Sequence, residues 1–243
     1  MLGELFLESH FSYGVIYRIE KIMVLNRQNN IYVEQCLEQC LPEFLHVNHY
    51  WDNKREQVIA KILPGEFYMT KDNVAIATTL GSCVSACIWD EKSGIGGMNH
   101  FMLPLTEKEA HEVDWGQRGI ASDATRYGNF AMEHLINMIL KSGGRKVNLR
   151  AKVFGGGKVL KQMSDVGDRN IRFVLKYLED ENISVESSDL GSFYPRKILF
   201  EPSSGRAFVK TIDNLHNDTI TRRENDYRSR IYEAPLEGDV ELF

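Results

Sequence analysis

Cys83 and His100 are the two side chains whose types and spacing in this sequence point to covalent chemistry. Cys83 follows a glycine-serine turn, and His100 comes 17 residues later. Two short apolar runs, 84–89 and 95–103, lie on either side of a Ser-Gly turn at 93–94, which is the pattern of a β-hairpin. A hairpin would bring His100 back beside Cys83, so we interpret the pair as a candidate nucleophile and base.

A cysteine thiol has to lose its proton before it can attack a carbonyl carbon. Its ordinary pKa is about 8.5, so a neighbouring imidazole that accepts the proton makes it a better nucleophile at neutral pH. Backbone N–H groups of Gly81, Ser82 and Cys83 could hold the oxygen that becomes negative during the attack. The alternative is structural, with Cys83 a small buried apolar residue and His100 a hydrogen-bonded core histidine. Glycines beside both residues bring the chemical interpretation level with the structural one, because glycine lets a substrate backbone approach closely.

Six short motifs surround this pair and occur in order over about residues 58–212. They are Leu80-Gly81-Ser82-Cys83-Val84, Gly96-Gly97-Met98-Asn99-His100-Phe101-Met102-Leu103-Pro104, Arg126-Tyr127-Gly128-Asn129-Phe130-Ala131-Met132-Glu133, Ala151-Lys152-Val153-Phe154-Gly155-Gly156, Gly167-Asp168-Arg169-Asn170-Ile171 and Asp189-Leu190-Gly191-Ser192-Phe193-Tyr194-Pro195-Arg196. In this order they resemble the signature of the CheD family, the chemoreceptor glutamine deamidases of bacterial chemotaxis. So many ordered motifs make a chance similarity implausible.

The resemblance implies a cysteine hydrolase that converts receptor glutamine side chains to glutamate. It assigns Cys83 as nucleophile, His100 as base and a threonine upstream as the third member of a triad. In the family pattern this threonine lies five or six residues before the cysteine. Here Ala77 is six residues before it, and Thr78 and Thr79 are five and four residues before it. The assignment therefore stays open between the two threonines, and we prefer Thr78.

The resemblance also implies partners and a compartment. The expected partners are the cytoplasmic domains of chemoreceptors and a CheC-type phosphatase, in the cytoplasm, with no metal or organic cofactor. A non-catalytic adaptor that binds chemoreceptors or such a phosphatase is the alternative from another class of function. A retained Cys83–His100 pair favours the enzyme.

Apolar periodicity predicts one domain of mixed α and β structure. Consecutive strands and two long helices favour layered α/β or α+β packing, and the family resemblance implies an α-β-β-α sandwich. Besides the hairpin, the predicted strands are 57–63, 74–80, 147–154, 183–189, 197–201 and 206–212, and the predicted helices are 122–141 and 168–182.

Composition and the family resemblance together divide the chain into three parts. The 243 residues, of which 43% are hydrophobic, are enough for one substantial core with extensions. We predict an N-terminal extension over 1–56, a CheD-like deamidase domain over 57–212 and a C-terminal tail over 213–243. The tail contains eight acidic residues and four arginines. Its high charge and low apolar content predict a solvated, mobile segment.

A glycine-rich stretch at 154–158 superficially resembles a phosphate-binding loop. It lacks the Walker spacing and the Ser or Thr that follows it. We therefore favour a tight strand-to-helix connection beside the active site, with Phe154, Gly155 and Gly156 as a candidate substrate-site loop, over a nucleotide-binding protein.

Charge and cysteine usage exclude several other classes. A net charge of −5 and a pI of about 5.8 argue against a general nucleic-acid binder. Four cysteines are too few for a disulfide scaffold of this length. Cys36 and Cys40 share one face of a predicted helix, but two further ligands are needed for a metal site. No apolar run approaches the roughly 18 residues of a membrane span.

Overall fold

The computed structural model describes residues 30–103, 123–159, 165–212 and 218–233. The chain divides into two compact units, 1–59 and 60–243. In the first unit, residues 30–39 are helical and are followed by the short 3-10 helix η1 (Pro42–Phe44) and strand β1 (Asn48–Asp52). Strand β2 (Gln57–Lys61) then leads into the second unit.

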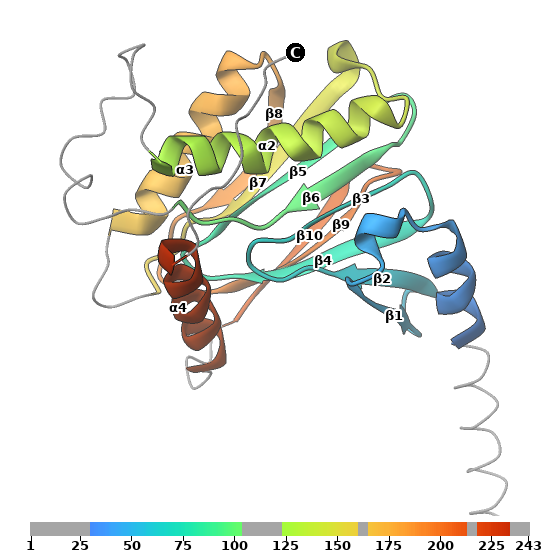
Figure 1. The fold of residues 1–243 in the computed structure, drawn as a ribbon, viewed down its shortest axis with the longest axis horizontal. Coiled ribbons are helices and arrows are strands. Elements are labelled where there is room, and N and C mark those ends of the chain that lie inside the picture. The colour runs from blue at the N-terminus through green and yellow to red at the C-terminus, as the bar shows by residue number, and fades with distance from the viewer. Residues whose placement is uncertain (1–29, 104–122, 160–164, 213–217, 234–243) are drawn as a thin grey trace, which may run out of the picture. The chain divides into compact units, whose positions relative to one another are not determined.

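The second unit is built on two β-sheets (Figure 1). In the first sheet, β4 and β10 both pair antiparallel with β9, and β2 lies next to β4. The second sheet has the order β3-β6-β5-β7-β8, with β7 and β8 parallel and the other pairs antiparallel. The strands are β3 (Phe67–Thr70), β4 (Val74–Leu80), β5 (Val84–Asp90), β6 (Gly96–Asn99), β7 (Leu149–Gly155), β8 (Ser184–Leu190), β9 (Arg196–Glu201) and β10 (Arg206–Thr211).

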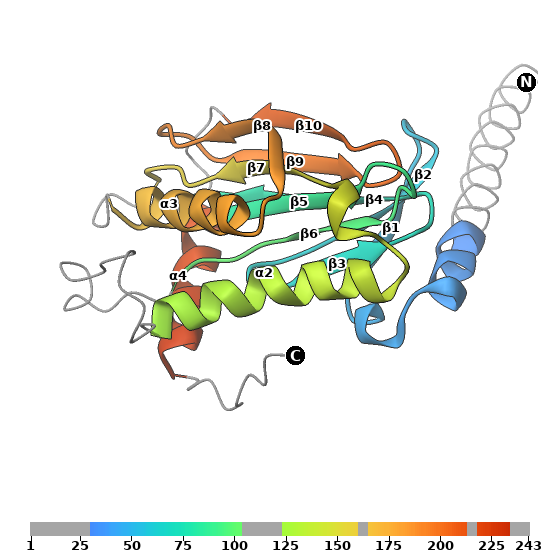
Figure 2. The ribbon, with the colours of Figure 1, turned by 90° about the horizontal axis from the view of Figure 1, so that it is seen from above.

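Helices α2 (Asp123–Lys141) and α3 (Asp165–Asp180) lie side by side along the second sheet (Figure 2). The first sheet lies on the other side, and the rings of Trp89 on β5 and Phe200 on β9 are 5.9 Å apart. Strand β5 is therefore covered on both faces, and all seven of its residues are buried. These layers of helix and sheet confirm the predicted α+β fold.

Most of the predicted elements are confirmed within two or three residues. The 84–89 run forms β5, and residues 96–99 of the predicted 95–103 run form β6, which completes the hairpin; β4, β9 and both helices lie where periodicity placed them. Strand β3 was missed because its four residues are too few to show an alternating pattern. Its register with Gly96–Asn99 of β6 shows that pairing, rather than local sequence, defines it.

The prediction of a solvated, mobile tail from residue 213 onward is wrong for residues 218–233. They form helix α4 (Asp218–Glu233), which lies at the end of the two sheets (Figure 1). Its side chains Ile220, Glu224 and Tyr227 are only 7%, 1% and 5% exposed. These positions are four and three residues apart, so one face of α4 is buried although the helix is strongly charged.

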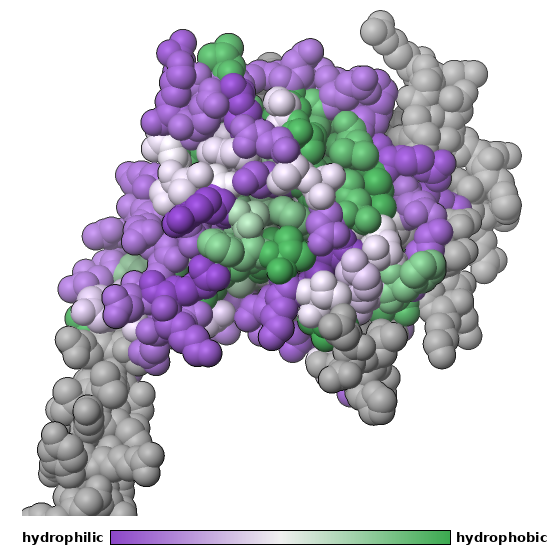
Figure 3. Space-filling model, turned by 180° about the vertical axis from the view of Figure 1, so that it is seen from behind, coloured by the Kyte–Doolittle hydropathy of each residue, from purple (hydrophilic) through white to green (hydrophobic). Residues whose placement is uncertain are grey.

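The face of the molecule seen in Figure 3 is mainly hydrophilic. Seen from behind, it carries a central hydrophobic patch surrounded by polar residues (Figure 3). Large apolar side chains that are partly exposed include Phe208 and Val209 of β10. Within the described residues, no helix combines the length and apolar character needed to cross a bilayer.

Candidate active site

Cys83 lies in a three-residue connection between the two sheets. Strand β4 ends at Leu80 and β5 begins at Val84, so Gly81, Ser82 and Cys83 carry the chain from one sheet to the other. We call residues 81–83 the donor loop, because their N–H groups point into the site. The Cys83 side chain is fully buried.

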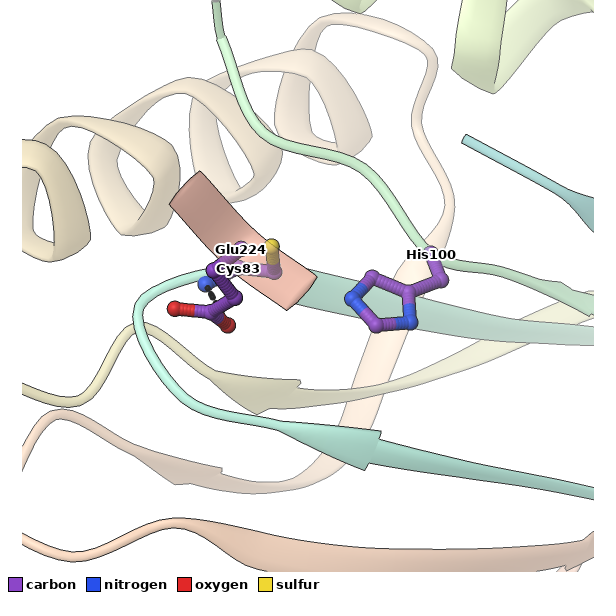
Figure 4. Close-up of side chains that lie close together, drawn as sticks. All are labelled: Cys83, His100 and Glu224. Atoms are coloured by element: carbon purple, nitrogen blue, oxygen red, sulfur yellow. Dashed lines mark hydrogen bonds between the residues drawn. The ribbon is translucent and has the colours of Figure 1, made fainter. Parts of the chain in front are cut away.

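The hairpin β5–β6 brings His100 to this loop, as the spacing predicts. Phe101 forms a bridge with Val84, the residue next to Cys83. The backbone of His100 is fixed by hydrogen bonds of 2.9 Å to Glu66 O and 2.8 Å from Gly65 N. As a result, the Cys83 sulfur, a His100 ring nitrogen and a Glu224 carboxylate oxygen all lie within 4.8 Å of one another (Figure 4).

Of the two candidate threonines, Thr78 is the one beside the His100 ring. Its Oγ1 lies 2.7 Å from His100 Nδ1 and 3.0 Å from the carbonyl oxygen of Ile62. A hydroxyl has one proton, and a carbonyl can only accept, so Thr78 donates to Ile62 and accepts from Nδ1–H. Thr79 is the next residue of the same strand, so its side chain points to the opposite face.

This arrangement leaves the lone pair of His100 on Nε2. Nε2 is buried and has no hydrogen-bond partner among the described residues. The ring edge opposite the Cβ atom, which carries Nε2, faces Cys83 and Glu224 (Figure 4). An unpartnered basic nitrogen aimed at a thiol is typical of a cysteine nucleophile with its base.

Burial keeps both groups neutral in this state. Desolvation lowers the pKa of His100 from 6.5 to about 3. Desolvation also raises the pKa of the Cys83 thiol well above its ordinary value, and the negative charge and hydrogen bond of Glu224 raise it further. Both shifts favour a protonated thiol beside a neutral imidazole.

The donor loop binds a carboxylate. The N–H groups of Gly81 and Cys83 donate to Glu224 Oε1 at 2.8 and 3.1 Å, and the N–H and Oγ–H of Ser82 donate to Oε2 at 2.8 and 2.7 Å. Successive N–H groups that converge in this way form an anion-binding concavity, which is also the geometry of an oxyanion hole. Sequence reasoning assigned these N–H groups to an oxyanion but missed Glu224, which is 143 residues from Gly81.

The carbonyl groups of the donor loop are held on its other side. Gly157 N donates to Gly81 O at 2.7 Å, and Gly156 N donates to Cys83 O at 2.8 Å. Asn170 Nδ2 of α3 donates to Ser82 O at 2.9 Å. With its carbonyls fixed in this way, the loop turns its N–H groups toward the site.

The predicted glycine-rich stretch thus lies behind the donor loop. A Cβ atom at Gly155, where φ is +107°, would come within 2.2 Å of Cys83 O. The N–H groups of Gly156 and Gly157 are already used by the loop carbonyls, which is the physical reason against a phosphate site. Phe154 is buried at the end of β7, next to this connection.

Asn170 is a second residue that sequence reasoning did not assign to the site. It lies in the Gly-Asp-Arg-Asn motif, but an asparagine on a predicted helix carries no chemical signal by itself. The structure shows it fully buried, with Oδ1 accepting from Leu103 N at 2.9 Å. It therefore ties the donor loop to the chain that leaves His100.

Cys83, His100 and Glu224 offer one ligand atom each at metal-binding separations. The Glu224 carboxylate, however, accepts four hydrogen bonds from N–H and O–H groups whose positive ends point at it. Such donors favour an anion and repel a cation. The geometry thus fits a carboxylate or an oxyanion better than a metal ion.

A small pocket opens beside His100. Its walls come from β2 and the following turn, from β4 and from α4, and Thr79 contributes as well as Thr78. The lining residues are Lys61, Ile62, Leu63, Pro64, Thr78, Thr79, His100, Ile220, Arg223 and Glu224.

A buried cysteine, a histidine fixed by a threonine and a loop of N–H donors together have the geometry of a cysteine hydrolase. Comparison with known proteins identifies the family to which the chain is similar. The family model described as CheD chemotactic sensory transduction matches residues 102–211.

Curated relatives extend this match over most of the chain. A protein of Halorhodospira halophila is 51% identical over 204 residues, which are 84% of this chain and 93% of the relative. Relatives from Hahella chejuensis and Methylobacillus flagellatus are 48% and 49% identical over 84% of this chain, and over 93% and 98% of their own lengths. All three are named probable chemoreceptor glutamine deamidase CheD. The chain belongs to the CheD family.

Proposed function

We propose that this chain is a protein-glutamine glutaminase that converts glutamine side chains of chemoreceptors to glutamate in chemotaxis signalling. The observation that carries the proposal is the position of Cys83, between the Nε2 edge of His100 and the three N–H groups of the donor loop. The names of the relatives support the same reaction.

The reaction begins when the Cys83 thiolate attacks the side-chain amide carbon of a glutamine. His100 Nε2 takes the thiol proton, and the N–H groups of Gly81, Ser82 and Cys83 hold the carbonyl oxygen as it becomes negative. His100 then passes the proton to the amide nitrogen, the C–N bond breaks, and ammonia leaves behind a thioester on Cys83.

Water completes the cycle. His100 removes a proton from a water molecule, which attacks the thioester carbon, and the C–S bond breaks to release glutamate and the Cys83 thiol. Thr78 holds the ring in the tautomer that leaves Nε2 free for both proton transfers. The base and the oxyanion donors all belong to the chain, so the cycle needs neither metal nor organic cofactor.

The proposed partners follow from this reaction and from the family. The substrates are glutamines in the cytoplasmic domains of chemoreceptors, and the chain acts in the cytoplasm. A CheC-type phosphatase is a further proposed partner, which a binding measurement with the purified pair would test.

Mass spectrometry of receptor fragments tests the reaction. We expect the purified full chain to convert receptor glutamines to glutamates, a gain of about 1 Da per site as NH₂ is replaced by OH. Cys83→Ala should bind the fragments but leave their mass unchanged. Binding by both proteins with no mass change in either would support the adaptor function instead.

A further inference from the structure

The Glu224 side chain has the chemical form of the product of the proposed reaction. Deamidation leaves a glutamate side chain whose carboxylate lies beside the cysteine and in the oxyanion donors. Glu224 places its carboxylate in that position, with all three N–H groups of the donor loop on it and the Cys83 sulfur within 4.8 Å. It lies on α4, at the end of the two sheets (Figure 1).

We propose that α4 is an internal product analogue that occupies the active site and inhibits it, so that a substrate glutamine has to displace Glu224. This inference rests on the proposed deamidase function for the identity of the substrate. The occupation of the donor loop by Glu224 is independent of that function.

Further contacts show that α4 is packed against the protein beside the site. Ile220 and Tyr227 flank Glu224 on the same face of the helix and are buried with it. The hydroxyl of Tyr227 contacts the hydroxyl of Tyr127 on α2. Its ring lies against Gly65, where an added Cβ would come within 2.6 Å of Tyr227 Cε2.

The donor loop also fits the carboxylate closely. A Cβ atom on Gly81 would lie 2.8 Å from Glu224 Oε2, so a side chain larger than glycine would collide with the bound carboxylate. The same absence of a Cβ leaves room for the carboxamide of a substrate. One space therefore serves Glu224 or a substrate glutamine, and both cannot occupy it together.

The chemistry of the occupied site is that of an inactive state. Cys83 and His100 are 0% and 1% exposed, so a substrate has no access to either while α4 is bound. The Glu224 charge also disfavours the thiolate that the reaction requires. Since β10 ends at Thr211 and α4 begins at Asp218, the tether is short, and the effective concentration of Glu224 at the site is on the order of millimolar or higher.

Alkylation of Cys83 tests the proposal without any receptor. We would treat the full-length protein, Glu224→Ala and Asp226→Ala with iodoacetamide and follow Cys83 by peptide-resolved mass spectrometry. Asp226 is an exposed carboxylate on the opposite face of α4, so its removal is the matched control. We expect Glu224→Ala to react about tenfold faster or more, as several hydrogen bonds to a charged group are lost, and Asp226→Ala to react like the wild type. Equal rates in all three proteins would overturn the inhibition.

Deamidation of receptor fragments by the same proteins separates the two proposals. Faster alkylation and faster deamidation in Glu224→Ala support both. Faster alkylation without deamidation in any protein supports inhibition by α4 and contradicts the proposed function. Glu224→Ala could instead melt at a lower temperature and gain neither reactivity nor activity. That result would show that Glu224 only stabilises the fold, which also overturns the inhibition.

A charge-neutral variant tests whether Glu224 is held as a product would be. Glu224→Gln places a side-chain amide on the donor loop, so Cys83 should hydrolyse it within the molecule, releasing ammonia and restoring a glutamate with a gain of about 1 Da. The peptide containing position 224 would be followed by mass spectrometry over time, with Glu224→Gln/Cys83→Ala as the control that should not change. A stable amide in the Cys83-containing variant, with its receptor activity intact, would overturn the product-like placement.

Discussion

At His100, the Thr78 hydroxyl decides which ring nitrogen carries the proton. The Thr78 hydroxyl donates its hydrogen bond to the carbonyl oxygen of Ile62, so it can only accept from His100 Nδ1–H. The ring is thereby fixed with Nε2 as the base that faces Cys83. Removing this hydroxyl should loosen the ring and its tautomer without removing the nucleophile.

We therefore expect Thr78→Ala to lower kcat by about one to two orders of magnitude, within the range for a misplaced general base. Thr78→Ser keeps the hydroxyl and should recover most of the activity, whereas Thr79→Ala should cost much less. Ammonia release from receptor fragments measures all three. A larger loss in Thr79→Ala than in Thr78→Ala would reverse the assignment.

The second buried cysteine provides a control for the nucleophile. Cys87 lies inside β5, where burial raises the pKa of its thiol, and it is in register with Lys152 of β7. We expect Cys83→Ala to abolish deamidation and Cys87→Ala to retain it, with both variants folded by circular dichroism. An inactive, folded Cys87→Ala protein beside an active Cys83→Ala protein would contradict the proposed mechanism.

Residue types and spacing predicted the Cys83–His100 pair because a short hairpin joins them. They favoured Thr78 over Thr79 but left the choice open, since it depends on which face of β4 turns toward the histidine, where the structure places Thr78. Glu224 and Asn170 were not predicted at all. Their roles arise from contacts with a loop far away in the sequence, and an isolated Glu or Asn carries no signal of such a contact.

At the scale of elements, the donor loop is held from both sides. Its carbonyl groups accept hydrogen bonds from Gly156, Gly157 and Asn170, and its N–H groups donate to Glu224 of α4. Periodicity predicted the strands and helices that frame this loop, because each of them buries one face or both. It did not predict α4, a charged helix in which three of the residues with described burial are buried, one of them a glutamate.

The contacts of α4 predict how strongly the donor loop is protected from exchange. Tyr227→Ala removes the ring that lies on Gly65, so α4 should open more often and expose the N–H groups of Gly81, Ser82 and Cys83. Hydrogen–deuterium exchange should show faster exchange in the peptide covering 81–83 and in α4, by about tenfold or more if a contact worth 1.4 kcal/mol or more is lost. The amides of β7 should keep their wild-type rates, and unchanged exchange at 81–83 would contradict the role of Tyr227.

At the scale of the whole molecule, the buried site links folding to pH. His100 is buried as a neutral ring, and its pKa is lowered from 6.5 to about 3 by desolvation. Between these values the unfolded chain binds a proton at His100 that the folded chain does not bind. The unfolded state is therefore favoured as the pH falls, and the stability that depends on a neutral His100 is fully present only above about pH 6.5.

We expect the free energy of unfolding to fall as the pH is lowered from about 6.5 toward 3, with this histidine contributing at most about 1.4 kcal/mol per pH unit. His100→Gln lacks the titrating ring, so its stability should depend less steeply on pH over the same window. Urea unfolding at pH 7, 6 and 5 measures these slopes, and equal slopes in the wild type and His100→Gln would show that His100 is not buried as a neutral base.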